Sequence, residues 1–477
     1  MSQQVVIVGA GFSGTLTAIH LLRDPDARVH VTLVDRTGRF GPGVAYATRR
    51  HEHVLNVPAG RMGAFPEAPG HFLEWLKRNE PTAAGAFVPR ALYGRYLAEL
   101  LTEAAKNSPG RLETLHADID NLLVQEQGVT LTLRPASGPP RSLHATHAVL
   151  ATGNFPPSDP SLADPSFFRS PRYHRDPWQF LERPPEDLLS APQSAVLLIG
   201  TGLTMIDVAL TLSQAGMGGR IHAISRRGLL PAPHRPEAPN FHPTPPADID
   251  AWPCTTLGLL KRVRSEIERA GAQGRDWREV ITSLRSNTPA LWRKLDDRQK
   301  TRFVRWVRPY WDVSRHRTAP NSATLINSLI DAGQLSVQAG RLLSITDTPA
   351  GAIVEYRPRG GGAPVRLTVS QVVNCTGPDT RCAHADPLLA TLAQRGVISP
   401  DSLELGLRTQ TDGRLLDARG TPQSRLWLVG PMRRADLWEA TAVPELRIQA
   451  AQVAASILET GRHASSASVL SGSALIR

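Results

Sequence analysis

The sequence predicts an α/β protein with two doubly wound parallel sheets, of which the second is inserted into the first. Two observations lead to this prediction. A glycine-rich turn between an apolar strand and an amphipathic helix occurs at the start of the chain and again about 190 residues later. A further strand and helix at 425–459 have no sheet to join unless the chain returns to the first domain. The 477 residues are enough for two or three domains with cores of their own.

The first unit begins with an apolar strand at 5–8, a turn with three glycines and a helix whose apolar residues recur at helical spacing. A second strand at 29–35 follows and ends in Asp35. The later strands of this unit are expected at 112–118, 129–135 and 147–151, and the last runs into the turn Ala151-Thr152-Gly153.

The second unit repeats this order. A strand at 195–200 meets a turn with two glycines, a helix follows, and the next strand at 221–225 ends in a serine. Its later strands are expected at 335–340, 353–358 and 371–375, and the last again runs into a Thr-Gly turn. Because the order is shared, we expect both units to form Rossmann-like domains, each of which binds a dinucleotide.

The first turn has the spacing of a dinucleotide-binding fingerprint. Gly9 makes the tight turn, Gly11 leaves room for a pyrophosphate at the helix N-terminus, and Gly14 lets the helix pack closely on the strand. Asp35 follows 26 positions after Gly9, at the strand end where an acid binds the ribose hydroxyls of an adenosine. The residues expected to bind FAD are Gly9, Gly11, Ser13, Gly14, Asp35, Thr152 and Gly153.

The second turn differs at two places. Met205 replaces the third glycine, so the helix is expected slightly further from the strand. At the strand end a hydroxyl and two guanidiniums stand where the first unit has an acid, and these groups suit a 2′-phosphate. The pattern favours NADPH over NADH, with hydride passing from nicotinamide to flavin at the domain junction. An arginine that only stacks on adenine or is solvated is the alternative. The expected residues are Gly200, Gly202, Ser225, Arg226 and Arg227.

The domain boundaries follow from the two units. Residues 1–155 are expected to form the first part of the FAD-binding domain. Residues 190–384 are expected to form the NAD(P)H-binding domain, with a helical insert at about 255–320. The chain then returns to the FAD domain at 385–461, and the small, polar residues 462–477 predict a loose C-terminal tail.

Composition argues against several other classes of protein. The net charge is +11, but no basic arm and no RNA-binding aromatic pattern accompany it, so we expect no nucleic-acid partner. No apolar run reaches the ~20 residues of a membrane span, and the first strand starts too early for a signal peptide. The three cysteines form no C-x-x-C or other close metal-type pair, so neither zinc nor a disulfide framework is indicated, and so few thiols suit a reducing cytoplasm. His51 and His53 lack a third ligand nearby and are expected in a surface loop, with no metal.

Longer stretches of the chain resemble known flavoproteins. The two glycine turns with the ATG turn are similar to two-domain FAD/NAD(P)H flavoproteins, which include the flavin-containing, Baeyer–Villiger and amine N-hydroxylating monooxygenases. The stretches 41–62, 225–235, 308–320 and 437–450 resemble a bacterial NAD(P)/FAD-binding family, and the likeness extends over nearly the whole chain. One type of FAD-dependent urate hydroxylase is similar to this group, so the resemblance implies urate as the leading substrate.

The chain also departs from related flavoproteins. Pro431 stands where disulfide-reductase relatives have an acid that contacts the flavin ribityl chain, although Gly430 can still approach that chain. The second Thr-Gly turn starts with Cys375 instead of alanine. A disulfide reductase needs a cysteine pair beside the flavin, and the first cysteine here is Cys254, so that reaction is excluded. Flavin reduction by NAD(P)H, followed by O₂ activation or electron transfer to an acceptor, remains.

Two segments are candidates for chemistry at the flavin. Loop 41–62 is expected to cover the ring, with the Asn56 amide either at the ring or only tying the loop to backbone. A helix that starts near Pro444 would direct its N-terminus at the flavin pyrimidine and stabilise the negative charge of reduced flavin. Thr441 and Trp438 precede this helix and are expected close to the ring, with a plain core role as the alternative for Trp438.

The basic stretch 308–317 is the candidate substrate segment. Arg315 and Arg317 lie near two aromatic residues and suit an anionic, flat substrate or the NADPH phosphates, whereas a solvated basic helix end is the alternative. His316 is a candidate general base, because an imidazole titrates near neutral pH.

The sequence therefore predicts an NAD(P)H-dependent FAD monooxygenase. Its expected partners are O₂ and a small polar, anionic, nitrogen-containing substrate, best represented by urate and hence by purine catabolism. The alternatives are a flavin-linked NAD(P)H oxidoreductase without oxygen insertion and a non-enzymatic nucleotide-bound sensor. Substrate-dependent NADPH consumption separates the monooxygenase from the sensor, and hydroxylated product separates it from the other oxidoreductase.

Overall fold

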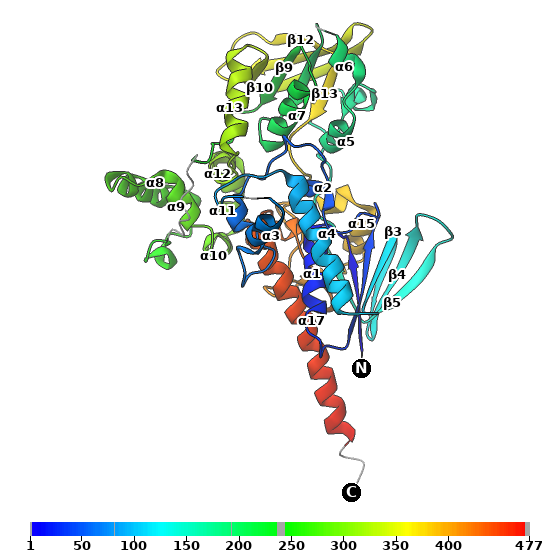
Figure 1. Cartoon of the computed structure of the whole chain (residues 1–477). Helices are drawn as coiled ribbons and strands as arrows, with labels where there is room; N and C mark the ends of the chain where they lie inside the picture. The colour runs from blue at the N-terminus through cyan, green and yellow to red at the C-terminus, as the bar shows by residue number, and fades with distance from the viewer. Residues whose placement is uncertain (1, 81, 192, 236–243, 473–477) are drawn as a thin grey trace.

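The computed structural model describes residues 2–80, 82–191, 193–235 and 244–472. It consists of two lobes, each built around one β-sheet, and a group of helices that projects to one side (Figure 1). One sheet has eight strands and the other has seven. The predicted fold class is confirmed: two doubly wound domains are present, and the eight-stranded sheet takes strands from both ends of the chain, with the other sheet between them in sequence.

The lower lobe in Figure 1 contains the eight-stranded sheet. Its strands lie in the order β14 (Arg414–Leu416), β15 (Pro422–Leu428), β6 (His147–Leu150), β1 (Gln3–Val8), β2 (Val29–Asp35), β3 (Leu112–Gln125), β4 (Gly128–Pro135) and β5 (Arg141–Ala145). The central strands are parallel, and β3 continues past them into an antiparallel hairpin with β4. The late strand β15 pairs with β6, so the end of the chain completes the first sheet.

The upper lobe contains the seven-stranded sheet. Its strands lie in the order β12 (Val365–Val369), β11 (Gly351–Pro358), β10 (Leu335–Thr348), β9 (Arg220–Ser225), β8 (Ala195–Ile199), β13 (Gln371–Asn374) and β7 (Tyr173–His174). From β13 to β12 this order matches that from β6 to β5 in the other lobe. Even the register irregularity in the long third strand occurs in both lobes. The repeat predicted from the sequence is therefore a repeat of topology.

Helices cover the sheets and close the cores. In the lower lobe α1 (Phe12–Leu22) packs against α4 (Arg90–Asn107) and α17 (Val443–Gly472), which ends away from the body of the protein (Figure 1). In the upper lobe α7 (Leu203–Gln214) packs against α13 (Pro320–Asp331). The apolar face predicted for α17 is buried at Leu446, Ala450, Val453 and Ile457. The shorter helices are α2 (Gly43–Tyr46), α3 (His71–Asn79), α5 (Pro177–Glu182), α6 (Glu186–Ser190), α14 (Cys382–Ala385), α15 (Pro387–Gln394) and α16 (Arg434–Leu437).

The projecting helices lie between β9 and α13 in sequence. They are α8 (Thr256–Ala272), α9 (Trp277–Ser283), α10 (Thr288–Arg293), α11 (Asp297–Arg302) and α12 (Arg308–Arg315), and we call them the helical insert. A π-helical turn at Phe303–Val307 joins α11 to α12. Trp292 of α10 donates a hydrogen bond to the Ala435 carbonyl at 2.8 Å and packs on Trp438, so the insert rests on the lower lobe.

The C-terminal tail predicted at 462–477 begins inside α17, and residues 473–477 lie outside the described residues. Within the described part of the chain, no helix has both the length and the apolar character that crossing a bilayer requires.

Candidate functional site

The turn after β1 requires glycine at two positions for packing alone. Gly9 has a φ of +105°, and a Cβ there would lie 2.2 Å from the Ala151 carbonyl oxygen. A Cβ at Gly14 would lie 1.9 Å from the Gly9 carbonyl oxygen, so α1 sits directly on the strand end. A Cβ at Gly11 would meet only the Gly43 Cα, at an ordinary 3.4 Å. Packing therefore does not demand glycine at Gly11, and approach by a pyrophosphate is a reason that remains.

The acid at the end of β2 is tied to this turn. The Ala10 N–H donates to Asp35 Oδ2 at 3.0 Å, and the Thr37 N–H and hydroxyl donate to Oδ1 at 2.8 and 2.6 Å. Two carboxylate oxygens provide about four acceptor sites, and Asp35 is only half-buried. The side chain thus holds the turn and retains one acceptor site for the predicted ribose hydroxyl.

Four separate segments meet at the first turn. Gly430, with a φ of +110°, follows β15, and a Cβ there would lie 3.3 Å from the Ser13 hydroxyl on α1. The Gly430 N–H donates to Gln449 Oε1 of α17 at 3.1 Å. Thr152 and Gly153 follow the Ala151 carbonyl that touches Gly9, and Gly153 has a φ of +69°. The structure therefore brings together the predicted residues of 9–14, 151–153 and 430, whereas Thr441 lies exposed before α17.

Two buried polar atoms at this junction lack a partner among the described residues. They are the Thr152 hydroxyl and the Gln449 side-chain nitrogen. Buried polar groups in folded proteins are nearly always hydrogen-bonded, because an unpaired one loses its hydration without compensation. A polar ligand at the junction would supply the missing partners, so the donor set fits the dinucleotide predicted here. Gln449 was not singled out from the sequence, where it is one polar residue in a long helix.

The turn after β8 repeats the first turn with one change. Gly200 has a φ of +114°, and a Cβ there would lie 2.5 Å from the Cys375 carbonyl oxygen, as Gly9 meets Ala151. Gly202 stands at the start of α7, and no atom lies within 4 Å of a Cβ added there. Met205 is fully buried in the core of this lobe. The position of the third glycine thus accommodates a whole side chain, as the sequence predicted.

The hydroxyl at the end of β9 is committed to the fold. The Gly228 N–H donates to Ser225 Oγ at 2.9 Å, and Ser225 Oγ lies 2.9 Å from Thr201 Oγ1. Thr201 donates its own proton to the Leu229 carbonyl at 2.6 Å, so Ser225 must donate its single proton to Thr201. In this arrangement Ser225 has no proton left for a phosphate, and it shapes the turn that carries the two arginines.

The two arginines after β9 face a basic, aromatic corner. Arg226 is exposed, and no ion pair within the described residues engages it. The guanidinium of Arg227 lies 5.6 Å from the ring centre of Tyr310 on α12. Hydrogen bonds from Arg359 and Arg227 lower the pKa of Tyr310. Arg359 donates its backbone N–H to Ala339, which pairs with Ser225 across the sheet, so a third guanidinium stands at the same strand ends. No local pattern in the sequence points to Arg359, because it follows a hairpin strand 133 residues after Arg226.

A buried ionic network joins the helical insert to the start of α17. Arg285 pairs with Glu445 in the first turn of α17. Arg315 of α12 lies 3.3 Å from Glu445 and 3.4 Å from Glu439, which is 2% exposed. The Trp311 indole donates to Glu439 at 2.8 Å. Arg315, predicted for a substrate, is thus paired with two carboxylates and holds the insert against the segment before α17.

The other candidates of the basic stretch lie around this network. Burial lowers the pKa of His316, and nearby Glu439 opposes that effect only in part, so the imidazole is neutral at pH 7. Arg317 is buried beside the network and donates to the Thr282 hydroxyl at 2.8 Å. Trp438 is 3% exposed, has a φ of +58° and packs between Trp292 and other aromatic residues of the insert. The core position foreseen as the alternative for Trp438 is what the structure shows.

The loop at 41–62 lies over the first turn and reaches the second lobe. Gly43 has a φ of +56° and approaches Gly11, while the Asn56 carbonyl accepts a hydrogen bond from His234 Nε2 at 3.0 Å. His53 is fully buried between the hydroxyls of Thr48 and Thr211, at 2.9 Å from each. The expectation that His53 lies in a surface loop is wrong, because α7 of the other lobe covers it.

The cysteines offer no reactive pair. Burial raises the pKa of the Cys382 thiol to about 11 and that of Cys375 further still, and Cys254 is exposed by itself. Among the described residues, no three His, Cys, Asp or Glu side chains come close enough together to hold a metal ion.

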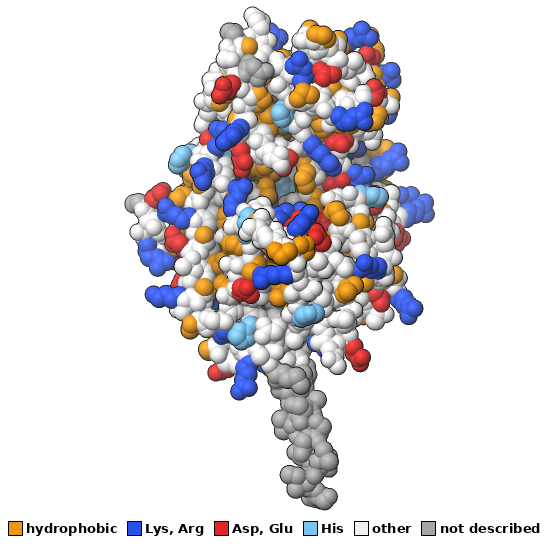
Figure 2. All heavy atoms as spheres, turned by 90° about the vertical axis from the view of Figure 1, so that its right-hand side faces the viewer, with side chains coloured by type: hydrophobic (Ala, Val, Ile, Leu, Met, Phe, Trp, Pro, Cys, Tyr) orange, Lys and Arg blue, Asp and Glu red, His pale blue; other side chains and the backbone are white. Residues whose placement is uncertain are grey.

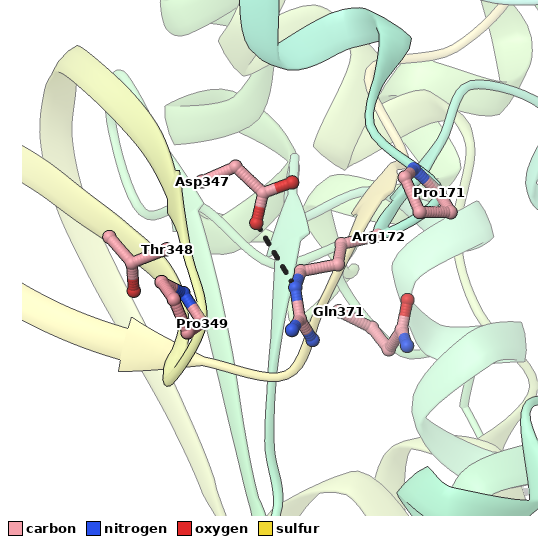
Figure 3. Close-up of a pocket in the computed structure, with 6 residues that line it drawn as sticks. All are labelled: Pro171, Arg172, Asp347, Thr348, Pro349 and Gln371. Atoms are coloured by element: carbon pink, nitrogen blue, oxygen red, sulfur yellow. Dashed lines mark hydrogen bonds and ion pairs between the residues drawn. The ribbon is translucent and has the colours of Figure 1, made fainter.

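A separate pocket of about 520 Å³ lies in the upper lobe, at the end of the sheet opposite the glycine turn. It is lined by Arg172, Asp347 and Gln371, with the guanidinium of Arg172 directed at Asp347 (Figure 3). Gln371 starts β13, so this pocket is at the amino ends of the parallel strands, away from the glycine turn. It does not belong to the predicted dinucleotide site.

Comparison with known proteins agrees with this geometry. Residues 6–155 match a family model described as FAD-NAD(P)-binding. No curated protein sequence matches the chain. The match covers the first turn, the acid of β2 and the Thr-Gly turn after β6, which are the parts of the lower lobe that meet at the junction.

Solved structures share the whole fold. L-lysine 6-monooxygenase from Pseudomonas syringae has a TM-score of 0.65 at 16% identity, with 96% of this chain and 99% of that chain covered. Ornithine hydroxylase from Pseudomonas aeruginosa has a TM-score of 0.62 at 14% identity, with the same coverage. Bacillithiol disulfide reductase from Bacillus cereus has a TM-score of 0.55 at 11% identity, with 96% and 100% covered. At these identities the likeness shows the fold alone.

Proposed function

We propose that this protein is an NADPH-dependent FAD monooxygenase, with FAD in the lower lobe and NADPH in the upper lobe. The observation that carries the proposal is the paired glycine turn. Gly9 and Gly200 occupy equivalent places in two sheets of the same strand order, each with a φ that only glycine adopts readily. Two unpartnered buried polar groups, on Thr152 and Gln449, adjoin the first turn.

The similar structures support the reaction class. One is named as an ornithine hydroxylase and one as an L-lysine 6-monooxygenase, and a further match, of TM-score 0.58, is named as a cadaverine monooxygenase bound to FAD. Another is named with reduced FAD, NADP⁺ and L-ornithine together. These names favour a small, polar, nitrogen-containing substrate for this chain as well. None of the names favours urate, which remains a prediction of the sequence to be tested beside the amines.

Each lobe contributes defined groups to its cofactor. The N-terminus of α1 at Gly11 would hold the FAD pyrophosphate, and Asp35 the adenosine ribose. In the upper lobe Gly202 would face the NADPH pyrophosphate, and Arg226 and Arg227 the 2′-phosphate. Bound FAD supplies the flavin that accepts hydride from NADPH and reacts with O₂.

The remaining predicted residues surround the lobe junction. The N-terminus of α17, after Thr441, would stabilise negative charge on the flavin pyrimidine. Asn56 would help to hold the covering loop, and the neutral His316 is suited to take up a proton from the substrate. Arg315 and Trp438 would shape the wall of the substrate site from behind, because ion pairs and aromatic packing already engage them. Arg317, which has no carboxylate partner among the described residues, would be the arginine of this stretch that contacts the substrate.

The cysteines argue against the disulfide reductase reaction. A reductase of that kind passes electrons through two adjacent thiols, whereas burial keeps Cys375 and Cys382 protonated and Cys254 stands alone. The fold shared with bacillithiol disulfide reductase therefore does not carry its chemistry to this chain by way of a thiol pair.

The experiment that tests the proposal measures NADPH oxidation and O₂ uptake by the FAD-loaded protein with L-ornithine, L-lysine, cadaverine and urate. A substrate that stimulates both rates equally and yields a hydroxylated product supports the monooxygenase. NADPH oxidation with a quinone acceptor and no hydroxylated product would favour the alternative of a flavin-linked oxidoreductase that does not insert oxygen. A protein that binds no FAD, or that oxidises no NADPH, would instead favour the alternative of a non-enzymatic nucleotide-bound sensor.

A further inference from the structure

Arg317 lies where the helical insert and both lobes meet. The chain segments 231–235 and 313–318 run side by side: the Ala232 N–H donates to the Val313 carbonyl, and the Thr318 N–H donates back to Ala232 at 3.0 Å. On the same segment, His234 donates its ring Nε2–H to the Asn56 carbonyl of the loop that covers the first turn. The backbone therefore fixes Arg317 at the junction between the two predicted cofactor sites.

The guanidinium of Arg317 has no carboxylate partner within the described residues. It is 8% exposed, its terminal nitrogen donates to Thr282, and its Nε–H is buried without a hydrogen-bond partner. Burial and the positive charges of Arg315, Arg278 and Arg61 lower the pKa of Arg317 to about 10, and Asp276 opposes this effect in part. Arg315 and Arg278 have carboxylate partners, whereas none of the described carboxylates pairs with the Arg317 guanidinium.

A second guanidinium of the same kind lies on α17. Arg447 donates to the carbonyls of Gly63 at 3.0 Å and Arg61 at 3.4 Å, and its Nε–H is also buried without a partner. Burial lowers the pKa of Arg447. The charge of Arg285 lowers it further, whereas Tyr93 acts in the opposite direction. The neighbouring Arg285, in contrast, has Glu445 as its partner. Among the described residues, the junction thus contains arginines with a carboxylate partner and arginines without one.

Buried charges without partners are costly, so a folded protein retains them where a ligand completes the pair. Figure 2 shows the face turned away from the helical insert, where Lys and Arg side chains are spread over both lobes. Burial also lowers the pKa of His234 to about 3, so the imidazole beside Arg317 stays neutral and adds no counter-charge of its own. A planar guanidinium with a free N–H is suited to a carboxylate, which it binds through two parallel hydrogen bonds.

We propose that Arg317 is the anchor of a carboxylate-binding site at this junction, and that this site holds the anionic end of the substrate. The inference rests on the proposed function and gives its substrate a chemical class, a small carboxylate. Arg447 and Arg61 raise the local positive potential, while His234 and Thr282 fix the positions of the loop and the anchor. Arg315 does not belong to the site, because Glu439 and Glu445 neutralise it.

The test is a titration of the FAD-loaded protein with benzoate, followed by thermal unfolding and by the visible flavin spectrum. We expect benzoate to raise the Tm and perturb the spectrum saturably, and Arg317→Gln to weaken its affinity at least tenfold. Arg317→Lys should give an intermediate loss of benzoate affinity, because lysine keeps the positive charge but lacks the planar guanidinium that binds a carboxylate through two hydrogen bonds. Arg264→Gln is the matched control, since Arg264 is an exposed arginine on α8 of the same insert.

A second readout separates binding from structure. Without benzoate, Arg317→Gln should be as stable as the parent protein or more stable, because the substitution removes a buried unpaired charge. A lower Tm for Arg317→Gln in the absence of any anion would indicate a structural role and contradict the proposal. Absence of a saturable benzoate response in the parent protein, or an equal response in Arg317→Gln, would also contradict it.

Competition between NADP⁺ and benzoate shows whether Arg317 binds the substrate or the nicotinamide cofactor. NADP⁺ should bind together with benzoate, and mutual exclusion of the two would assign Arg317 to the nicotinamide cofactor and overturn the proposal. Anion binding is measured without turnover, so the two proposals fail separately. Benzoate binding that depends on Arg317 in a protein that never oxidises NADPH would refute the proposed function and leave the anion site standing.

Discussion

The two lobes share one strand order but differ at the two places where a dinucleotide is chosen. In the lower lobe the third turn position has no room for a Cβ, whereas Met205 fills the equivalent position in the upper lobe. At the next strand end, Asp35 accepts from the Ala10 backbone, while Ser225 donates to the Thr201 hydroxyl at the equivalent turn residue. Both lobes therefore tie the strand end to the turn, but only the lower lobe does so with a carboxylate.

The shared fold thus determines where a dinucleotide would lie in each lobe, and the residue at the strand end determines which ribose substituent it would favour. In the proposed arrangement, the Asp35 carboxylate would accept hydrogen bonds from ribose hydroxyls and would repel a 2′-phosphate. In the upper lobe Ser225 leaves the corner without negative charge, and Arg226, Arg227 and Arg359 make it basic.

The largest effect is expected at the third turn position. Gly14→Ala places a Cβ 1.9 Å from the Gly9 carbonyl, so α1 must shift, with a loss of about 3 kcal/mol or more and of FAD. Gly202→Ala, where no atom lies within 4 Å, should cost about 1 kcal/mol or less yet weaken NADPH binding. Urea unfolding measures the stability of the two variants, flavin content per protein measures the loss of FAD, and titration with NADPH measures the weaker binding. Equal losses of stability in the two variants would contradict the account.

A smaller effect is expected at the strand end of the upper lobe. Arg226→Ala should weaken NADPH roughly tenfold to a hundredfold and leave NADH within about twofold, because it removes a charged contact to the 2′-phosphate alone. Binding of each nucleotide to the purified protein measures the ratio. Arg366→Ala, which removes an exposed arginine of the same sheet paired with Glu355, is the control. Parallel losses for both nucleotides would show that Arg226 contacts a group common to them.

The smallest effect concerns acid stability. His147 starts β6 and Gln371 holds the equivalent position in β13, each facing the fourth residue before the first turn glycine. Burial, with a contribution from Arg425, lowers the pKa of His147 to about 4. Protonation thus favours the unfolded chain, so this stability is complete above pH 6.5 and is lost progressively as the pH falls toward 4.

The exchange His147→Gln tests that sign. Between pH 6.5 and 5 the parent protein should lose about 2 kcal/mol through this group, and the variant should lose correspondingly less. Urea unfolding at the two pH values measures the difference. An identical loss in both proteins would mean that His147 does not titrate differently in the folded and unfolded states.

The sequence was enough to predict the fold and the glycine turns, because both depend on local spacing. Ser225 shows where such prediction stops: its single proton is committed only because Thr201 already donates to Leu229, a relation that depends on three-dimensional contact. His53 was misjudged for the same reason, since the Thr211 that covers it is 158 residues away. Arg359 and Gln449 reach the site from distant segments and carry no local pattern.

The pairing of Arg315 with two glutamates was equally invisible. In sequence Arg315 and Arg317 are indistinguishable basic neighbours. Within the described part of the chain, however, Arg315 pairs with two carboxylates, whereas the side-chain partner of Arg317 is a hydroxyl. Separating structural from ligand-binding arginines therefore requires knowledge of where the acids lie. Glu439 lies in the segment before α17, and Glu445 lies in the first turn of α17.

The most direct test of the central claim is anaerobic mixing of the FAD-loaded protein with NADPH, followed through the yellow absorbance of oxidised flavin. The account predicts rapid bleaching with NADPH, slower bleaching with NADH at equal concentration, and loss of the NADPH advantage in Arg226→Ala. Flavin that stays oxidised although NADPH is bound would contradict the claim that the two lobes hold two dinucleotides in one hydride-transfer path.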